Sequence, residues 1–164
     1  MFTANIRRKR VSVKSLSELI AADRTIAFRD LDLSGQTVAG GDFSGIRLED
    51  SNLSGCDLSG AILAGAMLAD CNFAGSTCCD TDFSRADLSR TKFSAADLVG
   101  SSFRDACLEG ADFSASDMAG CDLSGARMSG AMLMGANLSG ARMNDGTTYD
   151  PDRHDTFIHS MWRD

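Results

Sequence analysis

The chain has 164 residues, 43% of them hydrophobic, which is enough for one folded domain with its own core. Its formal net charge of −7 argues against a free-standing nucleic-acid binder, because such a protein needs a positive surface. The longest uncharged, mainly apolar run is residues 128–141, which is too short for a membrane-spanning helix of about 20 residues.

Residues 1–25 are expected to form a basic tail and an N-terminal capping helix. The basic run Arg7 to Arg10 is not followed by the apolar stretch of a secretory signal peptide. We interpret it as a solvated tail, with binding of a nucleic acid or a partner as the alternative. Ser15 and Glu18 have capping-box spacing, so a short helix over residues 16–23 is predicted to cover the start of the repeat described next.

Residues 26–145 carry a repeat with a period of five. Large apolar residues, with one cysteine among them, recur in 23 successive units without a shift of register, and Phe28 extends the series by one unit. The series consists of Leu33, Val38, Phe43, Leu48, Leu53, Leu58, Leu63, Leu68, Phe73, Cys78, Phe83, Leu88, Phe93, Leu98, Phe103, Leu108, Phe113, Met118, Leu123, Met128, Leu133, Leu138 and Met143.

Three further positions of the unit are restricted. The residue two before the large one is Ala, Ser, Cys or Thr in all 19 units from Ser51 to Ala141. The residue directly before it is Asp or Asn in 12 of 23 units, and the residue two after it is Gly in 14 of 23. The large and the small residue are therefore predicted to point inward, and Gly to sit near a corner whose dihedral angles it tolerates.

A period of five matches neither an α-helix, at 3.6 residues per turn, nor a strand, at two. It suits a chain that turns a corner in every unit, so that four units close one square coil. Stacked coils would pair backbone to backbone about 4.8 Å apart. Phe73, Phe93 and Phe113 are then expected in one inward column, with Phe83 and Phe103 in the opposite column.

The unit resembles that of the pentapeptide-repeat family, in which a small residue precedes Asp or Asn, then Leu or Phe, then two variable residues. Residues 86–90 (Ala-Asp-Leu-Ser-Arg) and 111–115 (Ala-Asp-Phe-Ser-Ala) show the pattern, and the resemblance covers residues 31–145. It implies an all-β solenoid, a right-handed quadrilateral β-helix of about six coils with short helical caps at both ends.

The family resemblance is compatible with more than one function. Its members do unrelated things, so fold alone does not assign one. Some resemble duplex DNA in width and charge and bind DNA gyrase or topoisomerase IV in its place, with inhibition of the enzyme or protection from quinolones as the result. The members that confer quinolone resistance carry projecting loops, and no insertion breaks the register in this chain.

Residues 146–164 are expected to cap the other end. Asp150 suits a helix N-cap and Pro151 the first helical position. Four large apolar residues would then fall on one helical face, either covering the last coil or forming a homodimer interface. They are Phe157, Ile158, Met161 and Trp162. Met132 and Met134 occupy outward positions in the last full coil and would add apolar surface nearby.

No constellation of catalytic, cofactor-binding or metal-binding residues stands out, so the protein is not expected to be an enzyme or to hold a cofactor. The only histidines, His154 and His159, are five apart and would not share a helical face. Cys79 and Cys107 are predicted to point outward, and the other four cysteines to pack inside. Without a readable secretory signal, six cysteines indicate reduced thiols in a bacterial-type cytoplasm; export as an effector is the alternative.

Charge distinguishes one column of the repeat from the others. Residues 31–145 hold 16 acidic and 7 basic residues, a net of −9. The column that contains Val38 and Leu58 has four acids and no basic residue, and these acids form a candidate interaction face: Asp57, Asp80, Asp97 and Asp117. The plainer interpretation is that they keep the rod soluble.

The sequence therefore indicates a non-catalytic scaffold for protein–protein interaction, whose partner is another protein. The alternative is an acidic DNA mimic that binds gyrase or topoisomerase IV. Neither function calls for membrane insertion or for direct nucleic-acid binding by the solenoid.

Overall fold

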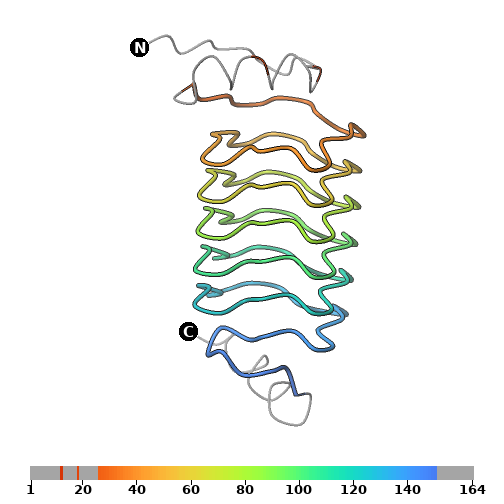
Figure 1. Cartoon of the computed structure of the whole chain (residues 1–164), viewed down its shortest axis with the longest axis vertical. Helices are drawn as coiled ribbons and strands as arrows, with labels where there is room; N and C mark the ends of the chain where they lie inside the picture. The colour runs from red at the N-terminus through yellow and green to blue at the C-terminus, as the bar shows by residue number, and fades with distance from the viewer. Residues whose placement is uncertain (1–11, 13–17, 19–25, 151–164) are drawn as a thin grey trace.

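The computed structural model describes residues 12, 18 and 26–150 of the chain. From residue 26 on, the backbone winds as a stack of similar coils along the long axis of the molecule (Figure 1). Parallel bridges join residues that lie 20 positions apart, one bridge in every five-residue unit, from Ala27 with Arg47 to Asp122 with Arg142. Four units therefore make one coil, and residues separated by four units lie in one column, as the repeat predicts.

The β character is confined to these isolated bridges. Residues 26–150 contain no continuous strand or helix, because a corner interrupts the extended backbone in every unit. The coils thus pair as expected for an all-β solenoid, but the paired stretches are single bridged residues and not continuous strands. Of the capping helix expected over residues 16–23, only Glu18 is described, and its backbone is helical. The rest of that helix, and residues 151–164 of the predicted C-terminal cap, lie outside the described residues.

Four faces follow one another around each coil, and we name them in chain order. Face A begins with residues 26–30, face B with residues 31–35, face C with residues 36–40 and face D with residues 41–45, and each recurs in every fourth unit. Along every unit the first and third residues point inward, the second and fourth point outward, and the fifth lies at the corner.

The large residues fill the interior of the coil. Phe73, Phe83, Phe93, Phe103 and Phe113 are fully buried. On face B the ring centroids of Phe73 and Phe93 are 4.8 Å apart and those of Phe93 and Phe113 are 5.2 Å apart, all stacked. On face D, Phe83 and Phe103 stack at 5.1 Å. Edge-to-face contacts at 5.7–6.0 Å join the two columns, so that aromatic rings cross the whole interior.

The small inward residues are buried beside them, and the polar ones are hydrogen-bonded. The Cys56 Sγ lies 3.0 Å from the Leu33 carbonyl oxygen, and the Thr81 hydroxyl donates to the Leu58 carbonyl oxygen at 2.8 Å. A buried hydroxyl or thiol without such a partner would be destabilising, because it gives up its bonds to water. Serine, threonine and cysteine therefore fit this position for their size and for their donor.

The corner residue has a left-handed backbone in nearly every unit. Glycine adopts it without strain, with φ between 63° and 72° in the repeat. Nine other residues adopt it too, with φ between 54° and 62°: Asp30, Asp50, Asp70, Asp80, Arg85, Arg90, Ala95, Asp105 and Ala115. Such a backbone costs an L-residue about 1–2 kcal/mol. The hydrogen bonds of the coils on either side hold these residues in it.

The repeat accounts for each of its five backbone N–H groups. The first bonds across the corner to the preceding unit, the second to the previous coil, and the third and fifth to the next coil. Where the second residue is Asp or Asn, the fourth N–H donates to its side chain. Ser59 N, for example, donates to Asp57 Oδ1 at 3.1 Å. This bond forms in all twelve units whose second residue is Asp or Asn.

At the C-terminal end the chain reverses. Arg142 pairs with Thr148 in an antiparallel bridge, Met143 N donates to the Thr147 carbonyl at 2.7 Å, and Tyr149 N donates to the Ala141 carbonyl at 2.7 Å. This hairpin covers the last edge of face D.

Replacing Ala96 with Leu tests the inward assignment. Ala96 is 2% exposed and faces the filled interior, so the larger side chain is expected to overpack the coil and to lower the free energy of unfolding by about 1–3 kcal/mol. Ala64→Leu, at an outward position, is the control, with a change within about 0.5 kcal/mol. Denaturant unfolding measures both; equal stability of the two variants would contradict the assignment.

The corner hydrogen bond is tested at Asp82, whose Oδ1 accepts from Ser84 N at 2.9 Å. Asp82→Ala removes the acceptor and is expected to lower the free energy of unfolding by about 1 kcal/mol. Asp82→Asn keeps the acceptor and is expected to stay within about 0.5 kcal/mol of the wild type. If the two variants unfold at the same denaturant concentration, the side chain does not stabilise the corner.

Candidate interaction surface

Face C brings the sequence-predicted acids together. Its outward bridge column runs through Thr37, Asp57, Thr77, Asp97, Asp117 and Asn137, each bridged to the next. Asp97 and Asp117 are thus direct neighbours, whereas Thr77 separates Asp57 from Asp97. Asp80 lies at the corner of the same face, with φ of 54°. The structure therefore places all four candidate acids on one side of the coil.

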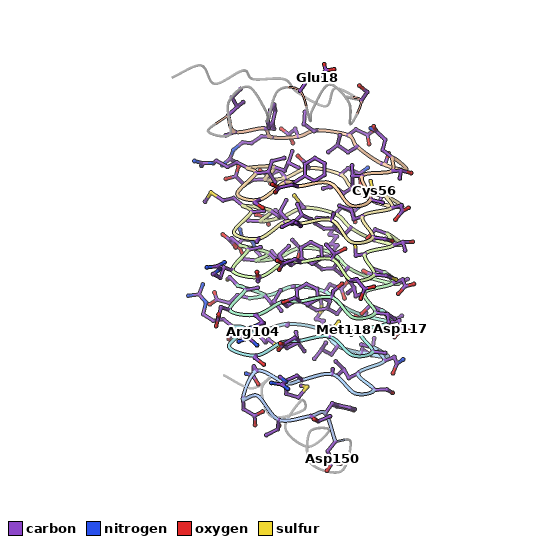
Figure 2. All side chains as sticks on the ribbon, viewed as in Figure 1. Glu18, Cys56, Arg104, Asp117, Met118 and Asp150 are labelled. Atoms are coloured by element: carbon purple, nitrogen blue, oxygen red, sulfur yellow. The ribbon has the colours of Figure 1, made fainter. Side chains whose placement is uncertain are left out.

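The acids of face C have no ionic partners among the described residues. The units of this face contain no Lys or Arg. The ion pairs of the described part of the chain join residues of faces A and D: Arg29 with Glu49 and Asp50, Arg47 with Glu49, Arg90 with Asp70, Arg127 with Glu109, and Arg104 with Asp122. Figure 2 shows Arg104 and Asp117 at opposite edges of the molecule. The negative charge on face C is therefore not neutralised by the rest of the coil.

Hydrogen bonds within the face hold its carboxylates in place. The hydroxyl and the backbone N–H of Ser59 donate to Asp57 Oδ1 at 2.7 and 3.1 Å, and these bonds hold the pKa of the Asp57 carboxyl below its usual range. Asn137 Nδ2 donates to Asp117 Oδ1 at 2.9 Å. The Asp57 carboxyl is consequently held in its charged form, and the side chains of Asp57 and Asp117 have little rotameric freedom left.

Asp80 is positioned differently, by a glycine of the next coil. A Cβ built on Gly100 would lie 2.4 Å from Asp80 Oδ1, so the carboxylate occupies the space that a side chain there would fill. Gly100 has φ of 71°, which glycine adopts without strain, and its lack of a side chain leaves room for the carboxylate. Asp105 lies over Gly125 in the same way on face D.

Four of the thiols are not activated as nucleophiles. Burial raises the pKa of Cys71, Cys78 and Cys121 to about 12. Burial and then the hydrogen bond and charge of Asp97 raise the pKa of Cys79 to about 11, although this thiol is only half-buried on face C. A nucleophilic cysteine needs the opposite shift, toward the thiolate.

Neither metal-binding nor membrane-spanning features occur in the described part of the chain. No group of three or more His, Cys, Asp or Glu side chains there could hold a metal ion. No described helix combines the length and the hydropathy needed to cross a bilayer. His154 and His159 lie outside the described residues.

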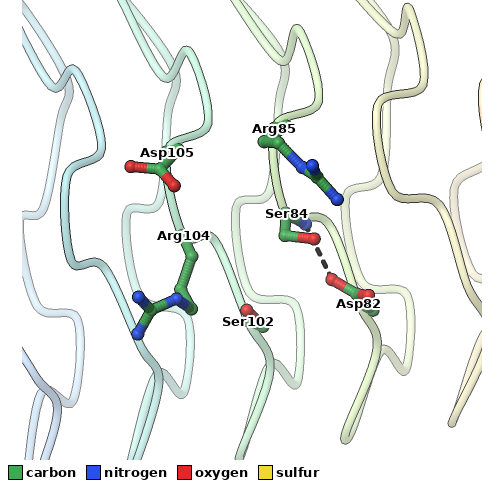
Figure 3. Close-up of a pocket in the computed structure, with 6 residues that line it drawn as sticks. All are labelled: Asp82, Ser84, Arg85, Ser102, Arg104 and Asp105. Carbon is green, nitrogen blue, oxygen red and sulfur yellow. Dashed lines mark hydrogen bonds between the residues drawn. The ribbon is translucent and has the colours of Figure 1, made fainter.

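Shallow pockets lie on face D, at its corner with face A, and at the corner between faces A and B. One is lined by two serines and four charged side chains, with Arg85 and Asp105 stacked one coil apart (Figure 3). Asp82 in this pocket is held by the corner bond to Ser84 N. Sequence reasoning missed this mixed-charge groove, although a spacing of four units brings Arg85 and Asp105 together.

The predicted C-terminal contacts cannot be placed in the same way. Phe157, Ile158, Met161 and Trp162 lie outside the described residues, as does the basic run Arg7 to Arg10. The outward methionines are described: Met132 is 40% exposed and Met134 is 80% exposed, on face B.

Comparison with known protein families identifies the type of the five-residue repeat. A family model described as pentapeptide repeats matches residues 28–65, 42–77, 66–105 and 106–145. No curated protein sequence matches the chain.

Several solved structures are similar to this chain. HetL, a pentapeptide-repeat protein involved in heterocyst differentiation regulation from the cyanobacterium Nostoc sp. strain PCC 7120, is 23% identical with a TM-score of 0.53, over 76% of this chain and 70% of HetL. A second Nostoc pentapeptide-repeat protein, alr5209, is 22% identical with a TM-score of 0.49, over 90% and 95%. Trypsin-treated QnrB1, a plasmid-mediated fluoroquinolone resistance protein, is 26% identical with a TM-score of 0.38, over 76% and 65%.

Square coils, each built from four five-residue units, together with a family match that extends from residue 28 to residue 145, lead to one assignment. This chain belongs to the pentapeptide-repeat family, whose members fold as right-handed quadrilateral β-helices.

Proposed function

We propose that this protein is a non-catalytic scaffold that binds another protein through face C. The observation that carries the proposal is the distribution of ion pairs. Five acids on faces A and D form ion pairs with arginines, whereas Asp57, Asp80, Asp97 and Asp117 have no ionic partner among the described residues and no Lys or Arg in the units of their face. A partner with Lys and Arg side chains would supply the missing counter-charges.

The geometry of face C favours binding by a rigid surface. Asp57 is fixed by Ser59 and Asp117 by Asn137, so these side chains lose little conformational entropy when a partner docks. Thr77 and Asn137 add hydrogen-bonding groups between and beside the carboxylates. Because the contacts are ionic and exposed, binding is expected to weaken as the salt concentration rises.

A DNA mimic directed at gyrase or topoisomerase IV is the second candidate, and the same unpaired acids support it. We place it second because the charge density of face C is lower than that of duplex DNA. Asp57 and Asp117 are three coils apart, about 14 Å at the usual spacing of paired strands. Duplex DNA carries about 8 charges over that length, and face C offers four.

The remaining features of the proposal follow from the sequence. We place the scaffold in a reducing cytoplasm, as a rod of about six coils with a short helical cap at each end. Four of its six cysteines are buried and free, which suits a fold that does not depend on disulfides.

Neutralising face C tests the scaffold proposal. The variant Asp57→Asn, Asp80→Asn, Asp97→Asn, Asp117→Asn is expected to fold normally, because Asn52, Asn72 and Asn137 already form the corner bond in the wild type. Each surface change is expected to stay within about 0.5 kcal/mol. A partner captured by the wild-type protein and identified by mass spectrometry is expected to lose most of its affinity for the variant, as measured by titration calorimetry.

The matched control removes four charges from the other faces. Asp82, Asp87 and Asp112 occupy the same repeat position as three of the face C acids, and Asp105 occupies the same corner position as Asp80. Changing these four to Asn gives the same net charge, so partner binding is expected to persist. Equal loss in both variants would show that net charge, not face C, attracts the partner.

The DNA-mimic candidate has its own test. Excess wild-type protein is added to a supercoiling assay with bacterial DNA gyrase and to a decatenation assay with topoisomerase IV. A mimic is expected to inhibit either enzyme or to protect it from a quinolone, and the face C variant to lose that effect while the control variant keeps it. If both enzymes are indifferent to the wild-type protein, the mimic candidate is wrong and the scaffold needs another partner.

A further inference from the structure

One outward column of face C carries an apolar side chain that the repeat does not require. The fourth residue of each unit points outward, and in most units of residues 26–145 it is Ser or Ala. Val99 and Met134 are the only large apolar residues at this position of the repeat, and Met134 belongs to the last coil. Val99 lies in the middle of the stack and is 39% exposed. Its side chain points away from the filled interior, so the packing of the core does not explain it.

Two unpaired acids of face C lie on either side of Val99. Val99 N donates to Asp97 Oδ1 at 3.3 Å, and Asp80 N donates to the Val99 carbonyl oxygen at 2.9 Å. The Asp80 carboxylate occupies the space beside Gly100, the next residue along the chain. Asp117 is bridged to Asp97 one coil further on. Backbone bonds therefore hold an exposed valine among carboxylates that have no ionic partner among the described residues.

The neighbours of Val99 along its own column are uncharged. Cys79 lies one coil before it and Ala119 one coil after it, and both are half-buried. Burial and then Asp97 raise the pKa of the Cys79 thiol to about 11, so this side chain is neutral near pH 7. We call Cys79, Val99 and Ala119 the central strip. At the usual spacing of paired strands the strip is about 10 Å long.

Face C is the one described face on which an exposed apolar side chain lies among acids without any Lys or Arg. The other exposed large hydrophobic residues lie on faces that contain Lys or Arg: Met67 on face A, Met132 and Met134 on face B, and Ile62 on face D. The apolar strip and the uncompensated charge therefore coincide on the same side of the coil.

We propose that the central strip makes face C specific for a protein segment in which one apolar side chain is flanked by Lys or Arg. This inference rests on the proposed function of face C and names the chemistry of its partner. The basic side chains would pair with Asp80, Asp97 and Asp117, and the apolar side chain would cover Val99. An apolar centre within a polar rim is the usual arrangement of protein interfaces. A face that imitated only the charges of DNA would gain nothing from a valine at this place.

Selection from a random peptide library displayed on phage tests this specificity. The full chain is the target, and the face C variant with four Asn removes peptides that do not need the acids. The enriched peptides are expected to share one aliphatic or aromatic residue between basic residues. The most enriched peptide is then synthesised, and its affinity for the wild-type protein and for each variant is measured by titration calorimetry.

Two variants separate the apolar contact from the charges. Val99→Ser is expected to weaken binding of the selected peptide about tenfold, because the buried apolar contact is lost. This factor is expected to persist at high salt, whereas the loss caused by the four Asn shrinks as salt screens the charges. Ile62→Ser removes a side chain of matching exposure, 41% against 39%, from face D and is expected to leave the affinity unchanged. Ser59 and Ser102 already occupy the same positions of these two faces, and circular dichroism melting checks that both variants fold.

The other outcomes separate this inference from the proposed function. Peptides that require the acids but bind Val99→Ser as tightly as the wild type would overturn the inference and leave face C as a binding surface. Purely basic enriched peptides, or equal losses for Val99→Ser and Ile62→Ser, would overturn it as well. If no enriched peptide requires the acids, the proposed function and this inference are both wrong.

Discussion

The corner that recurs in every repeat unit is the constraint on which the rest of this structure depends. A coil with four corners can pair with its neighbours through only a few backbone groups per side. The first N–H of each unit bonds to the preceding unit, and the fourth has no backbone acceptor in the described units. An Asp or Asn side chain accepts this N–H wherever the second residue of the unit is one of the two, as Asp57 does for Ser59. The acid content of the repeat is thus first a consequence of backbone satisfaction.

This origin changes how the negative charge is interpreted. Asp82 and Asp57 make the same corner bond, so the presence of an acid at that position says nothing about function. What differs between the faces is whether arginine accompanies the acids. Arg90 forms a two-pronged pair with Asp70, at 2.6 and 2.8 Å, and the resulting hydrogen bonds lower the pKa of Asp70. Exposed pairs of this kind add little stability, so their absence from face C costs the fold little and leaves its charge available.

The period of five predicted most of the interior. It placed the phenylalanine columns, the small buried residues and the exposed methionines, because inward and outward positions follow directly from a corner in each unit. It could not show that the corner N–H needs a side-chain acceptor, since that follows from the pairing of all five N–H groups. The hairpin at Met143 to Tyr149 carried a signal in Asp145-Gly146, a dipeptide typical of tight turns and out of phase with the repeat. Most of the ion pairs, such as Arg90 with Asp70, join residues about one coil apart in the sequence, and only the stacking of the coils brings them together.

The two ends of a solenoid pose a problem that the repeat cannot solve, because each added unit only moves the open edge along the axis. Face D is closed by the backbone itself: Thr147 and Tyr149 take the place that the next coil would have had. The same device cannot close faces A, B and C, because the hairpin returns along only one side. A segment that ends the rod must therefore break the five-residue pattern and bring apolar side chains to the remaining edge. The sequence after Asp150 no longer follows the period of five, and its large apolar residues stand at positions 157, 158, 161 and 162.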